Sequence, residues 1–161
     1  MNSFEKKDDL SFIHEAERVA TEALCLKAHC GVVIVSGGKI IGRGSNGPAG
    51  DAVGDRKCHR IRSDVQNHVH DRTCCVHAEW RAIMDALKTH PEKVHGSTLY
   101  FARVDERGVP MYSGEPYCTV CSRLALDAKI AHFVLLHRDG MRSYDTREYN
   151  EISYRNIDAR K

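Results

Sequence analysis

The sequence lacks long hydrophobic runs, a strong net charge and internal repeats. No apolar stretch among its 161 residues approaches the roughly 20 residues that span a bilayer, which excludes a transmembrane protein. The segment from Met1 to Asp9 has no apolar core of the kind that a signal peptide carries, so we expect a cytoplasmic protein. The net charge is only +2, which disfavours a nucleic acid partner because such partners are held by large basic surfaces.

The composition is that of one globular domain. Hydrophobic residues make up 42% of the chain and charged residues 29%, and a chain of this length buries a core without added staples. No linker or low-complexity segment divides the sequence. We therefore expect a single domain over residues 1–161.

Cysteine and histidine are abundant, with seven and ten residues. An odd cysteine count argues against a complete set of disulfides, and disulfides are rare in the reducing cytoplasm. Metal ligation is therefore the leading explanation for these residues.

The hydrophobic pattern predicts alternating helices and strands. Helical spacing runs from a cap at Asp8 or Asp9 to Leu24, and Gly37-Gly38 is typical of a hairpin turn between two strands. Residues 45–75 show no clear period and are expected to form a long loop. The remaining expected elements are strands 31–36, 39–44, 97–104 and 130–136, helices 77–89 and 118–129, and a further helix in the tail after Arg142. This order indicates an α/β protein, a three-layer α/β/α domain with a mixed central sheet of about five strands.

The segment Cys118-Thr-Val-Cys121 places two thiols three residues apart at the start of an expected helix. Both thiols can bind one metal ion, and the helix dipole favours their ionised form. Taken alone, this spacing also fits a structural zinc knuckle or a redox pair. The redox interpretation expects a thioredoxin-like setting, whereas Pro116 and a glycine-containing loop precede the motif here.

The segment His77-Ala-Glu79 opens the preceding expected helix and adds two further groups. His77 supplies a third metal ligand, and three protein ligands leave the fourth zinc position open for water, as in catalytic zinc sites. Bound zinc lowers the pKa of that water toward neutrality. Glu79 is expected to stand beside the metal as the catalytic group that accepts and returns the proton. A purely structural zinc site does not need this carboxylate.

Together, His77-Ala-Glu79 and Pro116…Cys118-Thr-Val-Cys121 resemble the zinc motif of the cytidine deaminase-like superfamily. The segment from Gly31 to Pro48 is similar to the first hairpin and following loop of deoxycytidylate deaminases. The resemblance covers roughly residues 10 to 137. It implies a zinc-dependent hydrolytic deaminase in which zinc-activated water attacks the amino-bearing carbon of a nucleobase.

The resemblance also implies substrate contacts and an assembly. Asn46 is expected to reach the substrate, although Ser-Asn-Gly-Pro is also a good turn sequence by itself. The backbone of Ala78 is expected to contact the pyrimidine edge. The tail tyrosines, Tyr144, Tyr149 and Tyr154, are expected either to close the pocket or to pack a terminal helix. Members of the family form homo-oligomers, which we expect here as well.

One residue departs from the family pattern. The family places proline directly before the first cysteine, whereas Tyr117 intervenes here. The mutual spacing of Cys118 and Cys121 is intact, so both remain predicted ligands. The local turn and the floor of the pocket are the features that the extra residue affects.

The loop leading to His77 is rich in potential metal ligands, and some deoxycytidylate deaminases carry a second, structural zinc in this region. A set of four Cys and His ligands would close such a site and fix a loop that lacks a core. The alternative is a substrate-covering loop with incidental histidines. The residues concerned in the 58–75 loop are Cys58, His59, His68, His70, Cys74 and Cys75.

The sequence thus predicts hydrolytic removal of an amino group from a nucleobase, and cytosine in a nucleoside or nucleotide is the favoured substrate. Adenine, guanine or another amino-heterocycle, free or in tRNA, is the alternative, as is a non-catalytic zinc-binding module. Arg43, Arg103, Arg107 and Arg138 are each available for a phosphate, and the sequence does not rank them.

Overall fold

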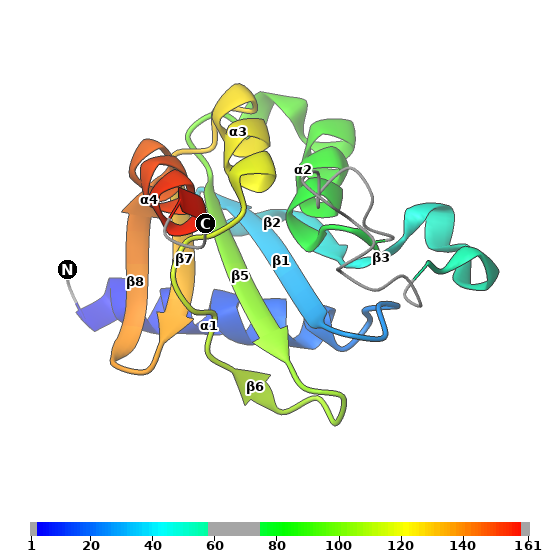
Figure 1. Ribbon diagram of the computed structural model, residues 1–161. Helices are drawn as coiled ribbons and strands as arrows, with labels where there is room; N and C mark the ends of the chain where they lie inside the picture. Colours follow the sequence, from blue (N-terminus) through cyan, green and yellow to red (C-terminus); the bar gives the residue numbers. More distant parts are fainter. Residues whose placement is uncertain (1–2, 58–74, 159–161) are drawn as a thin grey trace.

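The computed structural model describes residues 3–57 and 75–158 (Figure 1). A mixed sheet forms its centre, with the strand order β2-β1-β5-β7-β8 and a short strand, β6, paired with β5. The strands are β1 (His29–Ser36), β2 (Lys39–Ser45), β5 (Thr98–Val104), β6 (Pro110–Met111), β7 (His132–His137) and β8 (Gly140–Asp145). Among the strand pairs that the described residues form in this sheet, only β5 and β7 are parallel. Two-residue strands β3 (Gly47–Pro48) and β4 (Cys75–Val76) pair separately.

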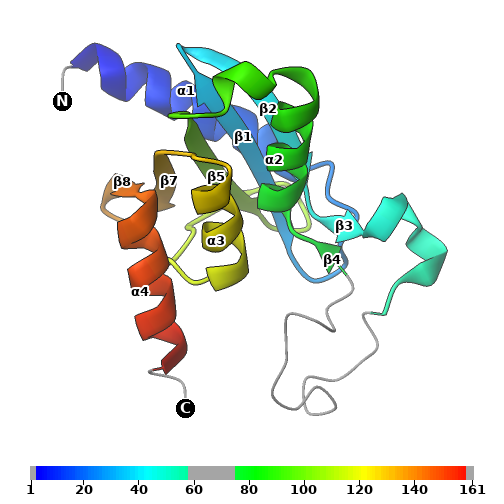
Figure 2. The same ribbon diagram turned by 90° about the horizontal axis from the view of Figure 1, so that it is seen from above.

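Helices cover both faces of the sheet, which confirms the three-layer α/β/α architecture (Figures 1 and 2). Helix α1 (Ser3–Ala20) packs Ile13, Ala16 and Val19 on one face, against β1, β5 and β7. The opposite face carries α2 (Ala78–Thr89), α3 (Thr119–Asp127) and α4 (Thr146–Asp158). Buried side chains of Val32, Leu99 and Phe133 line that second face.

Two glycines in β2 let α2 lie directly on the sheet. A Cβ atom at Gly42 would stand 2.5 Å from the carbonyl oxygen of Ala82, and a Cβ atom at Gly44 would stand 2.3 Å from the backbone nitrogen of Ala82. Both distances are far below a van der Waals contact, so no larger residue fits without moving the helix. Because His77 caps α2, these glycines also determine where the first turn of α2, and with it His77, is held.

Some predicted boundaries and faces are wrong. The first helix ends at Ala20 rather than Leu24, because the chain turns and the Leu24 N–H donates to the Asn46 carbonyl. The helical spacing of apolar residues also predicts that Leu10 and Leu87 lie on the buried sides of their helices, but they are 41% and 44% exposed. Strand β8 was not expected in the polar tail; it is an edge strand in which only Tyr144 is buried, so no run of apolar residues marks it. The expected tail helix is α4.

In the described part of the chain, no helix is long and apolar enough to cross a membrane.

Candidate metal centre

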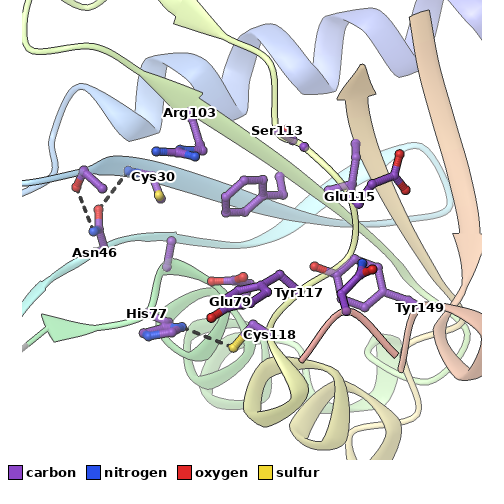
Figure 3. Close-up of a pocket in the computed structure, with 16 residues that line it drawn as sticks. Cys30, Asn46, His77, Glu79, Arg103, Ser113, Glu115, Tyr117, Cys118 and Tyr149 are labelled. Carbon is purple, nitrogen blue, oxygen red and sulfur yellow. Dashed lines mark hydrogen bonds between the residues drawn. The ribbon is translucent and has the colours of Figure 1, made fainter. Parts of the chain in front are cut away.

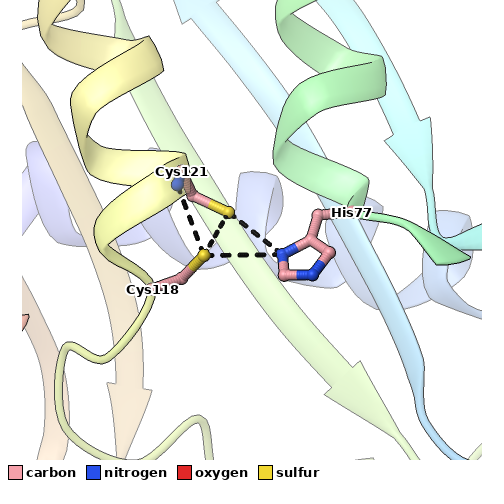
Figure 4. A group of neighbouring side chains, drawn as sticks. All are labelled: His77, Cys118 and Cys121. Atoms are coloured by element: carbon pink, nitrogen blue, oxygen red, sulfur yellow. Dashed lines mark hydrogen bonds between the residues drawn. The ribbon is translucent and has the colours of Figure 1, made fainter. Parts of the chain in front are cut away.

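Three predicted ligands meet at the amino ends of two neighbouring helices (Figure 4). His77 is the N-cap residue of α2, Cys118 is the N-cap residue of α3, and Cys121 lies in the first turn of α3. The His77 Nδ1 atom is 3.1 Å from the Cys121 sulfur and 3.5 Å from the Cys118 sulfur. The three ligand atoms lie within 4.8 Å of one another, so a single metal ion can contact all three.

The helix start at α3 orients the two sulfur atoms. Cys118 has an extended backbone, and its side chain accepts a hydrogen bond from the Cys121 N–H at 3.3 Å. This bond satisfies one of the free donors of the first turn and holds the Cys118 sulfur at the amino end of α3. The two sulfurs are 2.7 Å apart, and neither cysteine forms a disulfide.

The cluster favours an ionised thiolate next to a cationic ring. Hydrogen bonding with Cys121, and then with His77, lowers the pKa of Cys118 to about 4. The hydrogen bond with Cys118 raises the pKa of His77 to about 9. Burial raises the pKa of Cys121 well above its ordinary value. A cluster that already holds one thiolate is a site prepared for a cation, since metal ligation needs the deprotonated sulfur.

Glu79 stands beside these ligands in the first turn of α2 and is only 6% exposed. Burial is the main cause that raises the pKa of this carboxyl, and the nearby Cys118 thiolate adds to it. Its side chain also hydrogen-bonds with Cys121. A carboxyl whose pKa is moved toward neutrality by its surroundings suits an exchange of protons.

The cluster opens into a pocket of about 760 Å³ (Figure 3). His77, Glu79 and Cys118 line one side of it, and Cys30 of β1 and Arg103 of β5 lie on the other side. Phe101 of β5 also lines the pocket. Its remaining wall comes from the segment before α3 and from α4. The lining residues there are Ser113, Gly114, Glu115, Tyr117, Tyr149 and Asn156.

Both predicted substrate contacts lie at this pocket. Asn46 is buried, and its side-chain amide accepts a hydrogen bond from the Cys30 N–H and donates one to the Ala28 carbonyl, each at 2.8 Å. Asn46 therefore stabilises the backbone at the start of β1 through these two hydrogen bonds. Ala78 is fully buried and is the first residue of α2, where a backbone N–H has no acceptor within the helix.

The extra residue Tyr117 is accommodated without disturbing the ligands. Pro116 is buried, whereas Tyr117 is 40% exposed and lines the pocket. The Asn156 side chain of α4 donates to the Pro116 carbonyl at 2.7 Å and so fixes the turn that precedes Cys118. Of the tail tyrosines, Tyr149 lines the pocket and stacks on Phe133.

The two other tail tyrosines are placed apart from the pocket wall. Tyr144 is buried in β8 and hydrogen-bonds with His137 at 3.0 Å, and Tyr154 is 44% exposed.

The predicted second zinc site lies mainly outside the described residues. Cys58, His59, His68, His70 and Cys74 fall there, so this site stays a prediction. Cys75 is described, in β4, and its thiol hydrogen-bonds with that of Cys25.

The sequence alone did not assign Phe101, Ser113, Glu115 or Asn156 to the pocket, and it offered Arg103 only as one of four arginines available for a phosphate. Phe101 and Arg103 alternate with the buried residues Tyr100 and Ala102 along β5, and this period of two was a signal that they share one face. Ser113, Glu115 and Asn156 had no such signal, because only the folded chain brings their segments together.

Comparison with known families supports the motif. The family model described as "Cytidine and deoxycytidylate deaminase zinc-binding region" matches residues 6–137, a range that includes all three ligands and Glu79. A search of curated proteins finds no match.

Solved structures show the same fold. The dCMP deaminase of cyanophage S-TIM5 in complex with dCMP and dUMP is 20% identical, with a TM-score of 0.56 over 83% of this chain and 81% of its own. Its apo form gives 19% identity and a TM-score of 0.52 over 83% and 82%. Cytidine deaminase from Burkholderia pseudomallei is 15% identical, with a TM-score of 0.56 over 87% and 94%.

Proposed function

Because the chain belongs to the family of the cytidine and deoxycytidylate deaminase zinc-binding region, we propose that it deaminates cytosine in a nucleoside or nucleotide such as cytidine or dCMP, releasing ammonia. The family makes the chain a zinc-dependent hydrolytic deaminase, and the identity of the base is the proposed part. One observation carries the proposal: His77, Cys118 and Cys121 converge beside the buried carboxyl of Glu79 in one pocket.

The donor set fits zinc. One imidazole nitrogen and two thiol sulfurs are ligands that Zn²⁺ prefers, and three protein ligands leave one tetrahedral position for water. Zinc bound there supplies a water molecule whose pKa is lowered toward neutrality, and thus a nucleophile at physiological pH.

Glu79 is the proposed catalytic acid and base. In the proposed reaction its carboxylate takes the proton of the attacking water and delivers it to the ring nitrogen of the base. The carboxylate then takes the second proton of that water from the new hydroxyl as the carbonyl forms, and it passes this proton to the amino group, which leaves as ammonia when the C–N bond breaks. The raised pKa of Glu79 supports both halves of this cycle, because a carboxyl that holds its proton more firmly is a stronger base and still gives the proton up.

Two groups are proposed to orient the base. The N–H of Ala78, which as the first residue of α2 has no acceptor within the helix, is proposed to donate to an acceptor on the pyrimidine edge. Asn46 is proposed to contact the sugar or the base with the amide capacity that its two backbone bonds leave, since an amide group has four hydrogen-bonding positions.

An adenine, guanine or other amino-heterocycle substrate, free or in tRNA, is the alternative within the same chemistry. A non-catalytic zinc module is less well supported, because such a site gives no role to a carboxyl that is buried, costly to ionise and open to a pocket. The solved dCMP deaminase whose complex contains dCMP and dUMP favours a free nucleotide. We also propose a cytoplasmic homo-oligomer, which light scattering can test.

The deciding experiment is a screen for ammonia release over cytosine, adenine and guanine, each as base, nucleoside and monophosphate, with zinc content measured on the same preparation. The proposal expects the highest kcat/KM with a cytosine compound. Turnover of a purine with no turnover of any cytosine compound would refute the proposed substrate.

A further inference from the structure

Arg103 is a cation in the pocket wall that has no carboxylate partner within the described part of the chain. It lies near the carboxyl end of β5, where Cys30 of β1 and Met111 of β6 are its cross-strand neighbours. Among residues 3–57 and 75–158 it forms no hydrogen bond or ion pair through its side chain. The half-buried guanidinium has five N–H donors and no acceptor atom of its own, so it is suited to bind an anion.

Ser113 adds a second unused donor on the same side. Its Oγ atom is buried and has no hydrogen-bond partner within the described residues, although its backbone N–H donates to the Leu136 carbonyl at 2.9 Å. A buried hydroxyl without a hydrogen-bond partner destabilises the folded state, so the presence of such a hydroxyl in the pocket needs an explanation. Because Ser113 lines the pocket, a bound ligand can supply the missing acceptor.

The other arginines that the sequence offered for a phosphate are already engaged or lie elsewhere. Arg43 pairs with Glu15 at 3.1 Å, Arg107 pairs with Asp105 at 3.3 Å, and Arg138 lies over the Tyr112 ring. None of the three lines the pocket of the metal centre. The structure therefore ranks Arg103 first.

The opposing charge in the pocket wall is balanced locally. Glu115 is the carboxylate on that side, but it is 60% exposed and lies 3.8 Å from Arg142 and 3.9 Å from His137. Asp105, two residues beyond Arg103, accepts backbone hydrogen bonds from Arg107 and Val109 as well as pairing with Arg107. An anion near Arg103 thus meets a positive charge that none of the described carboxylates pairs with.

The position of this pair fits the far end of a nucleotide. Arg103 and Ser113 line the side of the pocket opposite His77, Glu79 and Cys118 (Figure 3). Phe101 also lines the pocket and precedes Arg103 by two residues on the same face of β5, which is about 6.6 Å of strand. Apolar Phe101 can meet the base or sugar while Arg103 meets a group farther out.

We propose that Arg103 and Ser113 form a subsite for the phosphate of the substrate, so that the enzyme prefers a nucleoside monophosphate to the nucleoside. The inference rests on the proposed function, because it assigns the far side of the same pocket. Arg103 supplies charge and a forked pair of donors, and Ser113 supplies one hydroxyl donor.

The test compares kcat/KM for dCMP and deoxycytidine in the zinc-loaded full-length protein. Wild type is expected to prefer dCMP, and Arg103→Gln should lower the dCMP/deoxycytidine ratio about 10- to 100-fold, the range for a charged hydrogen bond. Ser113→Ala should lower the ratio about 2- to 10-fold. Arg103→Lys, which keeps the charge without the fork, should restore part of it. Arg107→Gln, a matched control outside the pocket, should leave the ratio within about twofold.

An unchanged ratio in Arg103→Gln, or a wild-type preference for deoxycytidine, would overturn the subsite. A second measurement separates this result from a wrong base. Ribose 5-phosphate, which has no base, should raise the Tm of wild type and of Arg107→Gln but not that of Arg103→Gln. If no cytosine compound is deaminated, the proposed function fails, but the shift in Tm with ribose 5-phosphate still tests the phosphate subsite. Equal shifts in all three proteins, or no shift in any of them, would contradict the subsite.

Discussion

Replacing Glu79 by glutamine isolates its proton chemistry from the rest of the site. The amide has nearly the same shape as the carboxyl and keeps one hydrogen-bonding oxygen toward Cys121, but it cannot take up a proton from water. Glu79 is 6% exposed, so bulk water cannot easily replace it as the base. General acid–base assistance contributes about 10²–10⁴-fold, or about 3–5 kcal/mol of barrier, and kcat should fall by at least that factor.

The assay follows ammonia release on the best substrate at saturating concentration, with zinc content and Tm measured on the same sample. Glu115→Gln makes the same chemical change at an exposed carboxylate of the same pocket and should lower kcat less than tenfold. Glu79→Gln should retain its zinc, because the three ligands of the cluster do not include Glu79. Near-wild-type kcat in Glu79→Gln would refute the proposed role, and loss of zinc would make Glu79 a ligand instead.

Three further predictions concern the metal, the packing and the pH response. His77→Ala should abolish both zinc binding and activity. Elemental analysis of wild type should find at least one zinc ion per chain, and two if the 58–75 loop binds another. A folded and active wild-type protein without metal would contradict this prediction. Gly44→Ala should lower the free energy of unfolding by about 1–3 kcal/mol through overpacking, because its Cβ would stand 2.3 Å from the Ala82 nitrogen. Denaturant unfolding measures this change, and Gly54→Ala, which has open space at its Cβ, is the control. In the zinc-free protein, the raised pKa of Glu79 means that the folded state keeps a proton that the unfolded state loses above pH 4.5, so stability should fall as pH rises from there. Glu79→Gln should remove that dependence, and parallel stability curves for the two proteins from pH 5 to 8 would count against the burial argument.

The metal ligands and the core elements could be predicted because they depend on local spacing. His77-x-Glu79 and Cys118-x-x-Cys121 each stand at the start of a helix. The geometry of one helical turn sets how the side chains within each motif are oriented relative to each other, whatever the remaining fold. The buried strands β1 and β7 were visible as continuous apolar runs. The family resemblance was confirmed by the match over residues 6–137.

Features that depend on distant pairing were missed. Strand β8 carries polar residues on an exposed edge, so its hydrogen bonds with β7 leave no hydrophobic trace in the sequence. Asn156 contacts Pro116 across 40 residues of chain, and no spacing rule connects them. Arg103 could be named as one of four candidate arginines but not chosen, because its selection depends on which of the other three already have partners.

Removal and return of zinc tests the central claim most directly. The protein is treated with a chelator, its metal content and fold are measured, and ammonia release from cytidine and dCMP is followed before and after addition of one equivalent of Zn²⁺ per chain. The account predicts that activity disappears with the metal, returns with that single equivalent, and does not return in His77→Ala or in Glu79→Gln. Undiminished ammonia release from a folded protein shown to contain no metal would contradict it.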